Sequence, residues 1–361
     1  MSEASHDGRP TPQEYELALS RAAAQIATFE EEQVTALQRV QRFLHVYPTT
    51  VPFVVLVLGL LLGVAVNPLR FTAASNLSTV LTQVMVTGIV GIGQTLVILT
   101  AGIDLSIGLI MVISSVVMGR LAVIDGLPII LAFPLGLLCG AAFGYLNGVL
   151  VTRLKMPPFI VTLGTLSIIG ALNTFYSQSE TIGMQDIEEK GYFLQIMGNQ
   201  IAIGSARIMW GTFLMLLVAA VFWYVLNRTP YGRHVYATGD DPEAARLAGI
   251  DTDSILLSVY VLAGVIAAIA GWALIGRVGA ISPTAGENAN LDSITAVVIG
   301  GTSLFGGRGS IIGTLVGALI VGVFRSAVSL AGLDVLWQEF AIGVLIIVAV
   351  ALDQWIRRVS K

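Results

Sequence analysis

The stretch VMVTGIVGIGQTLVILTAGIDLSIGLIMVISSVVMG, residues 84–119, decides the fold. It is apolar almost throughout, and it is long enough for two helical passes through a bilayer, each of which needs about 20 residues. Near its middle stands Asp104, the only charged residue between Arg70 and Arg120. The stretch therefore predicts two membrane helices separated by a break that carries a carboxylate.

Similar apolar segments recur along the whole chain. Of its 361 residues, 55% are hydrophobic and 12% are charged, whereas ordinary soluble domains contain about 25% charged residues. The segments lie at about 50–68, 77–101, 105–124, 128–153, 157–178, 208–227, 253–275, 290–304, 309–330 and 335–354. We predict an all-α polytopic membrane protein with about ten transmembrane helices, some of them interrupted.

The distribution of basic residues predicts the orientation of these helices, because Lys and Arg are more frequent on the cytoplasmic side of membrane proteins. If every segment crosses and the N-terminus is cytoplasmic, the inner side carries Arg39, Arg42, Arg153, Lys155, Arg228, Arg233, Arg246, Arg308, Arg357, Arg358 and Lys361. The outer side then carries only Arg70, Arg120, Lys190, Arg207, Arg277 and Arg325. This excess predicts that both termini are cytoplasmic.

The chain divides into an N-terminal arm and a membrane domain. Residues 1–46 contain several glutamates and lack the short apolar core of a signal peptide, so we predict a cytoplasmic arm. Residues 47–361 form the transmembrane domain. Its two long connections are predicted outside at 179–207 and inside at 228–252.

The inner connection carries strong helix-start signals. Asp241 is a suitable N-cap, Pro242 fits the first helical position, and Gly249 suits the position after the last turn. At about twenty-five residues it is longer than the usual helix–helix connection of two to eight, which favours a docking surface for a cytoplasmic partner over a simple connector. The predicted docking residues are Gly239, Asp240, Asp241, Pro242, Glu243, Ala244, Ala245, Arg246, Leu247 and Gly249.

A weak internal repeat is also visible. GIDLSIG at 102–108 and GGRGSIIG at 306–313 both stand where one apolar helix ends and a glycine-rich one begins. Two halves with interrupted helices in corresponding places are typical of transporters.

Several kinds of chemistry are missing from the sequence. It has no G-x-x-x-x-G-K-[ST] phosphate loop. Its three histidines, at 6, 45 and 234, are not at metal-ligand spacing, and no nucleophile–base pair is legible. We expect no enzyme activity, no bound cofactor or metal, and no nucleic-acid partner. The chain is therefore not expected to bind ATP through a phosphate loop.

Three motifs together resemble one family. TLVILTAGIDLSIG (95–108), YGRHVYATGDDPEAARLAGI (231–250) and SPTAGENANLDSITAVVIGGTSLFGGRGSIIGTLVGALIVGVF (282–324) are similar to the permease subunits of bacterial monosaccharide ABC importers of the ribose/xylose/fructose type. Within that family, residues 225–249, GWALIGRVGAISPTAG (271–286) and LDQWIRR (352–358) look most like the fructose permease branch.

The resemblance implies a multi-pass protein of the bacterial inner membrane that works as a homodimer of permease copies around one pathway. It implies two further partners, a periplasmic sugar-binding protein and a cytoplasmic ATP-binding cassette protein, which hydrolyses the ATP. It makes the helix at 239–249 the coupling helix that contacts the cassette protein. It also implies a monosaccharide substrate, fructose first, with ribose or mannose as alternatives.

Polar residues in the apolar segments are candidates for the pathway or for the helix breaks. They are Gln83, Gln94, Thr95, Gly102, Asp104, Ser106, Asn147, Asn173, Asn288, Asn290, Thr302 and Arg308. Each polar side chain has the alternative role of a helix–helix hydrogen bond. Glu287 and Asp292 are candidates for docking the binding protein.

Asp104 has three interpretations. Its carboxylate can accept N–H bonds at the start of the third helix, it can pair with Arg308, or it can contact sugar or a proton. Two other functions stay open: a permease of the same family for a pentose or another sugar-like ligand, and an ion-coupled secondary transporter, in which Asp104 would be the coupling carboxylate.

Overall fold

Apolar helices make up most of the described chain. The computed structural model describes residues 50–286 and 288–357, and the predicted arm at 1–46 lies outside them. Seven helices in this part are long and apolar enough to cross a membrane. They are α5 (Ala74–Leu99), α6 (Ile107–Gly119) with the π-helical turn η1 (Arg120–Ile124), α7 (Ile129–Thr152), α8 (Pro158–Ser177), α11 (Trp210–Arg228), α14 (Thr252–Val278) and α16 (Ile311–Leu330).

The other three predicted segments are helical too, but they differ in length. They form α3 (Thr50–Val66), α15 (Ala289–Ile299) and α17 (Val335–Arg357). With 11 residues, α15 is about 16 Å long, roughly half of the ~30 Å hydrocarbon core. It therefore cannot cross a membrane by itself. Of the expected number of about ten crossing helices, the seven long ones are confirmed as candidate membrane spans.

The connection at 179–207 is folded rather than a plain loop. It contains α9 (Met184–Lys190), α10 (Tyr192–Gln195), the 3₁₀ turn η2 (Ile196–Gly198) and the strands β1 (Gln200–Ile203) and β2 (Ala206–Met209). The strands form an antiparallel hairpin in which Gln200 lies opposite Met209. This small sheet corrects the all-α prediction, which holds for the membrane helices.

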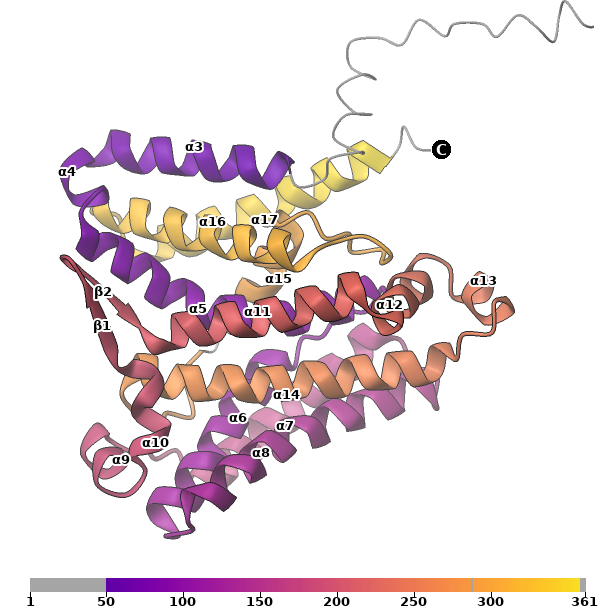
Figure 1. The fold of residues 1–361 in the computed structure, drawn as a ribbon, viewed down its shortest axis with the longest axis horizontal. Coiled ribbons are helices and arrows are strands. Elements are labelled where there is room, and N and C mark those ends of the chain that lie inside the picture. Colours follow the sequence, from indigo (N-terminus) through magenta and orange to yellow (C-terminus); the bar gives the residue numbers. More distant parts are fainter. Residues whose placement is uncertain (1–49, 287, 358–361) are drawn as a thin grey trace, which may run out of the picture. The chain divides into compact units, whose positions relative to one another are not determined.

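The two long connections lie at opposite ends of the helices. Figure 1 shows the hairpin, α9, α10 and the short helix α4 (Pro68–Phe71) at one end. The helices α12 (Pro230–Asp240) and α13 (Pro242–Leu247) lie at the other. This arrangement agrees with a topology in which one connection is outside and the other inside.

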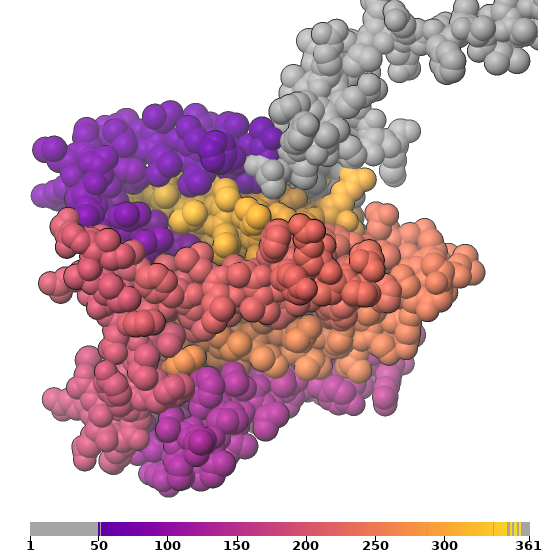
Figure 2. All heavy atoms as spheres, in the orientation of Figure 1, coloured from indigo at the N-terminus to yellow at the C-terminus, as the bar shows by residue number. Residues whose placement is uncertain are grey.

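Helix α5 forms the centre of the helical domain. It is buried from Val84 to Leu99 and packs against α11, α14, α15 and α16. Helices α7, α8 and α11 bury much less of their surface and expose large apolar side chains, as helices facing lipid do. Figure 2 shows one such face, on which α3 and α11 leave only a narrow strip of α16 visible.

The most extensive helix packing joins α7 to α14. Gly136, Gly140, Gly144 and Gly148 recur every fourth residue of α7 and therefore lie on one face. A Cβ added at Gly140 would run into the carbonyl oxygen of Gly264, and one at Gly144 into the carbonyl oxygen of Tyr260. Small residues allow this approach of two backbones, which is a main source of stability between membrane helices.

Replacing Gly140 with valine should therefore separate α7 from α14. We expect Gly140→Val to lower stability by about 1–3 kcal/mol or more, as overpacking does. The measurement is the thermal unfolding midpoint and the monodisperse yield of the detergent-solubilised protein. Gly164→Val on α8 is the matched control, because a Cβ there meets no atom within 4 Å. Equal losses in both variants would contradict this account of the packing.

Candidate functional site

The break after α5 closes with a tight backbone turn. The amide of Ala101 donates to the carbonyl of Ile98 (2.9 Å), and that of Gly102 donates to the carbonyl of Val97 (3.0 Å). Ala101 has a φ of 60°, the left-handed conformation that ends many helices. The chain then passes through Asp104 and resumes as α6 at Ile107.

The Asp104 carboxylate is held by the residues that start α6. Its Oδ1 accepts from the Ser106 amide (2.7 Å) and from the Ser106 hydroxyl (2.6 Å). Asn147 of α7 donates to the same hydroxyl at 2.9 Å. The side-chain amide of Gln94 donates to the backbone carbonyl of Asp104 and accepts from its backbone amide.

This geometry favours the first of the three interpretations of Asp104. The side chain is 1% exposed, and its hydrogen bonds come from the chain next to it. The pairing of Asp104 with Arg308 stays a prediction. The contact with sugar or a proton stays a prediction.

The break after α15 repeats the first turn. The amide of Gly301 donates to the carbonyl of Val298 (3.0 Å), and that of Thr302 donates to the carbonyl of Val297 (3.1 Å). Gly301 has a φ of 86°. These bonds have the same spacing as those after α5, so the two breaks begin with the same turn. The predicted repeat of GIDLSIG (102–108) in GGRGSIIG (306–313) lies after these turns and stays a prediction.

Helix α12 connects the two breaks, and the sequence prediction missed it. Gly239 lies so close to the carbonyl of Leu99 that no Cβ fits. That carbonyl also accepts from the Gly307 amide (2.9 Å). Tyr236 donates its hydroxyl to the carbonyl of Gly309 (2.9 Å). The last turns of α12 therefore contact the end of α5 and the loop before α16.

A local signal for α12 was present in the sequence. Thr229 caps the helix by accepting from the Gly232 amide (3.3 Å), and Pro230 occupies the first helical position. This is the same pairing of a polar cap with proline that predicted α13. Tyr231 also bonds Ser258 of α14 (2.8 Å), and burial raises the pKa of the Tyr231 and Tyr236 phenols.

Helix α13 (Pro242–Leu247) has the predicted N-cap at Asp241 and the predicted closing glycine at Gly249. Oδ1 of Asp241 accepts from the amides of Glu243 (2.9 Å) and Ala244 (3.0 Å), and Gly249 follows the helix with a φ of 85°. The predicted range 239–249 was too long at its start, because Gly239 and Asp240 belong to α12. Leu247, the last residue of α13, is 91% exposed.

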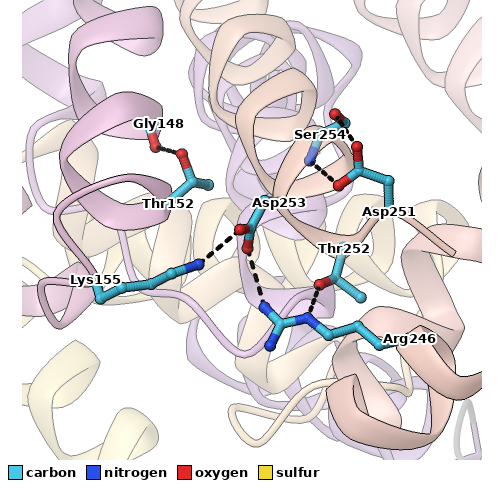
Figure 3. Close-up of polar contacts among 8 residues, drawn as sticks. All are labelled: Gly148, Thr152, Lys155, Arg246, Asp251, Thr252, Asp253 and Ser254. Carbon is cyan, nitrogen blue, oxygen red and sulfur yellow. Dashed lines mark hydrogen bonds and ion pairs between the residues drawn. The ribbon is translucent and has the colours of Figure 1, made fainter.

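An ion-pair network fixes α13 to two other elements (Figure 3). Asp253, at the start of α14, pairs with Arg246 of α13 (3.0 Å) and with Lys155 of the α7–α8 loop (2.6 Å). The Nε of Arg246 also donates to the Thr252 hydroxyl (2.7 Å). Asp251 caps α14, and the hydrogen bonds from Ser254 hold the pKa of its carboxyl below the usual value.

Most of the predicted pathway residues are buried within this one chain. Thr95 bonds Thr314 (2.6 Å), Asn173 donates to the carbonyl of Pro283 (2.9 Å), and Asn290 donates to that of Leu105 (3.2 Å). Such contacts join helices to one another or to the segments between them. Fully or nearly buried side chains among the candidates are Gln94, Thr95, Asp104, Ser106, Asn147, Asn173 and Thr302.

Of the two candidates for docking a binding protein, the structure describes Asp292. Asp292 is 8% exposed and pairs with Arg325 of α16 at 2.7 Å. This pairing leaves little of its carboxylate for a partner. Asn288, a neighbouring candidate for the pathway, donates to Glu339 of α17 (3.2 Å). Glu287 lies outside the described residues.

The sequence matches, over residues 76–350, a family described as branched-chain amino acid transport system / permease component. The chain is 52% identical over 360 residues to the fructose import permease protein FrcC of Rhizobium meliloti, covering 100% of both. It is 37% identical over 330 residues to the ribose import permease protein RbsC of Bacillus subtilis, covering 90% of this chain and 98% of the relative. It is 32% identical over 295 residues to the D-allose transport system permease protein AlsC of Escherichia coli, covering 81% and 88%. No solved structure matches.

Proposed function

Since the chain belongs to this family of transport permease components, we propose that it is the transmembrane permease subunit of an ATP-driven monosaccharide importer, with fructose as its main substrate. It is a multi-pass protein of the bacterial inner membrane. The full-length similarity to a fructose import permease is the observation that supports fructose as the substrate. Ribose and mannose are the alternatives among monosaccharides.

The proposed partners follow from this role. A cytoplasmic ATP-binding cassette protein hydrolyses ATP, and a periplasmic binding protein delivers the sugar. Two permease copies form the pathway between them. The burial of the polar candidates inside one chain supports this arrangement, because buried helix–helix contacts leave the pathway to be built where copies meet. Both termini lie in the cytoplasm, and the permease itself binds no cofactor.

Coupling runs through α13 and α12. When the cassette protein binds ATP, it moves α13. Helix α12 then passes this movement to Leu99 and Gly307, its contacts at the two helix breaks. The contacts of Gly239 and Tyr236 support this route. A partner can shift the permease between two states only by binding one of them better. The capped, rigid α13 is a suitable surface for such binding.

The experiment that tests the function is transport by the reconstituted complex. The permease, its cassette protein and its binding protein are placed in proteoliposomes, and sugar uptake and sugar-stimulated ATP hydrolysis are measured for a panel of hexoses and pentoses. Fructose should give the highest uptake. A pentose preference would support the alternative substrate class. Uptake that persists without the cassette protein would support an ion-coupled transporter and contradict the proposal.

Leu247 provides a prediction for the coupling surface. A leucine that is 91% exposed on a capped helix has the character of an interface anchor. Leu247→Asp should weaken binding of the cassette protein by about thirtyfold, the effect of losing about 2 kcal/mol at an anchor. Co-purification and sugar-stimulated ATP hydrolysis measure this. Leu333→Asp, at an exposed leucine between α16 and α17, is the control and should bind normally. A normal complex with Leu247→Asp would refute the role of α13.

A further inference from the structure

The loop between α7 and α8 lies beside α13 and shares its ion-pair network. Lys155 of this loop reaches across to Asp253, a residue 98 positions away in the sequence, and the same carboxylate holds Arg246 of α13. One oxygen of Asp253 serves each cation. Figure 3 shows the carboxylate between the two basic side chains. The loop and α13 are therefore bound through one side chain.

The loop has a fixed and unusual conformation. Lys155 has a φ of 54°, which non-glycine residues adopt only at a cost in free energy. Such a conformation persists only where the surroundings hold it. The ion pair of Lys155 with Asp253 and the prolines that follow, Pro157 and Pro158, provide that restraint. A restrained loop with a strained residue is typical of a site that must present a defined surface.

The surface that this loop presents is apolar. Leu154 is 62% exposed and Met156 is 37% exposed, on either side of Lys155. Neither Leu154 nor Met156 lies within a membrane helix, because α7 ends at Thr152 and α8 begins at Pro158. Leu247 of α13 is exposed as well, so both elements that Asp253 binds carry exposed apolar side chains.

We propose that the α7–α8 loop is a second contact surface for the ATP-hydrolysing partner, and that Asp253 clamps it to α13 so that both contact the partner as one unit. This inference rests on the proposed function, because it assigns a second surface to the partner that α13 binds. The continuity of the loop with α13 through Asp253 favours this protein partner over lipid. Asp253 acts as a positioning residue, and Leu154 and Met156 make the contact.

Site-directed photo-cross-linking tests the contact in the full complex. Cys139 is the only cysteine of the chain, so Cys139→Ser gives a cysteine-free background. Leu154→Cys, Leu247→Cys and Leu333→Cys are each labelled with a benzophenone maleimide, assembled with the cassette and binding proteins in lipid nanodiscs, and irradiated. Leu154→Cys and Leu247→Cys should both form adducts with the cassette protein, whereas Leu333→Cys should not.

The outcomes separate this inference from the proposed function. Adducts at 247 but not at 154 would overturn the second contact while the role of α13 stands. Adducts at neither position would contradict the proposed function itself. Adducts of position 154 with lipid alone would mean that the loop anchors to the membrane, which also overturns the inference.

The clamp is tested by variants of Asp253 in the same background. Asp253→Asn should lower the ratio of adducts at 154 to adducts at 247 by about fivefold, the factor expected for losing partly exposed ion pairs. Asp253→Glu keeps the charge and should restore the ratio. A general loss of structure would lower both adducts together, so an unchanged ratio in Asp253→Asn would show that Asp253 does not position the loop.

Discussion

Replacing Gly239 with valine is expected to abolish sugar uptake. A Cβ at this position overlaps the carbonyl oxygen of Leu99 and lies 2.8 Å from the amide nitrogen of Gly307. These two groups share a hydrogen bond that joins the end of α5 to the loop before α16. The valine would push α12 away from both, so movement of α13 would no longer reach the helix breaks.

Three measurements separate lost coupling from lost folding. Uptake into proteoliposomes should fall to background, while ATP hydrolysis by the complex should no longer respond to sugar-loaded binding protein. The thermal unfolding midpoint reports any general damage. Gly126→Asn, in the connection between α6 and α7, is the matched control, because Gly126 has a positive φ that asparagine tolerates and no atom near its Cβ position. Normal, sugar-stimulated uptake by Gly239→Val would refute the coupling route through α12.

Features that depend on neighbouring residues were predictable from the sequence. The cap of α13 by Asp241, its proline and its closing Gly249 involve only residues within one or two turns. The bonds of Asp104 to Ser106 are equally local. Hydrophobic segments also predicted each membrane helix, because length and apolarity are properties of the segment itself.

Features that depend on distant residues were not predictable. The contact of Gly239 with Leu99 brings together backbones that no spacing rule relates. The same holds for the pairing of Lys155 with Asp253, and for that of Asp292 with Arg325. Helix α12 is a different case, because its Thr229–Pro230 start was legible, but the segment was interpreted as a loop before α13.

Two substitutions of Asp104 are expected to show whether its hydrogen bonds or its charge are required. In Asp104→Leu the amide and hydroxyl of Ser106 would lose their acceptor in a fully buried site. Each such loss costs about 1–3 kcal/mol, so this variant should assemble poorly. Asp104→Asn keeps a carbonyl oxygen in place of Oδ1 and should retain most assembly and most uptake.

The control for Asp104 is a buried polar group that has no partner to lose. Thr212 of α11 is buried, and its hydroxyl has no hydrogen-bond partner in the described chain, so Thr212→Val should be close to neutral in membrane level, unfolding midpoint and uptake. If Asp104→Asn reached the membrane in normal amounts with a normal midpoint but transported no sugar, the carboxylate charge itself would be required. Asp104 would then act in the transport cycle, and the hydrogen bonds to Ser106 would describe how it is held rather than why it is there.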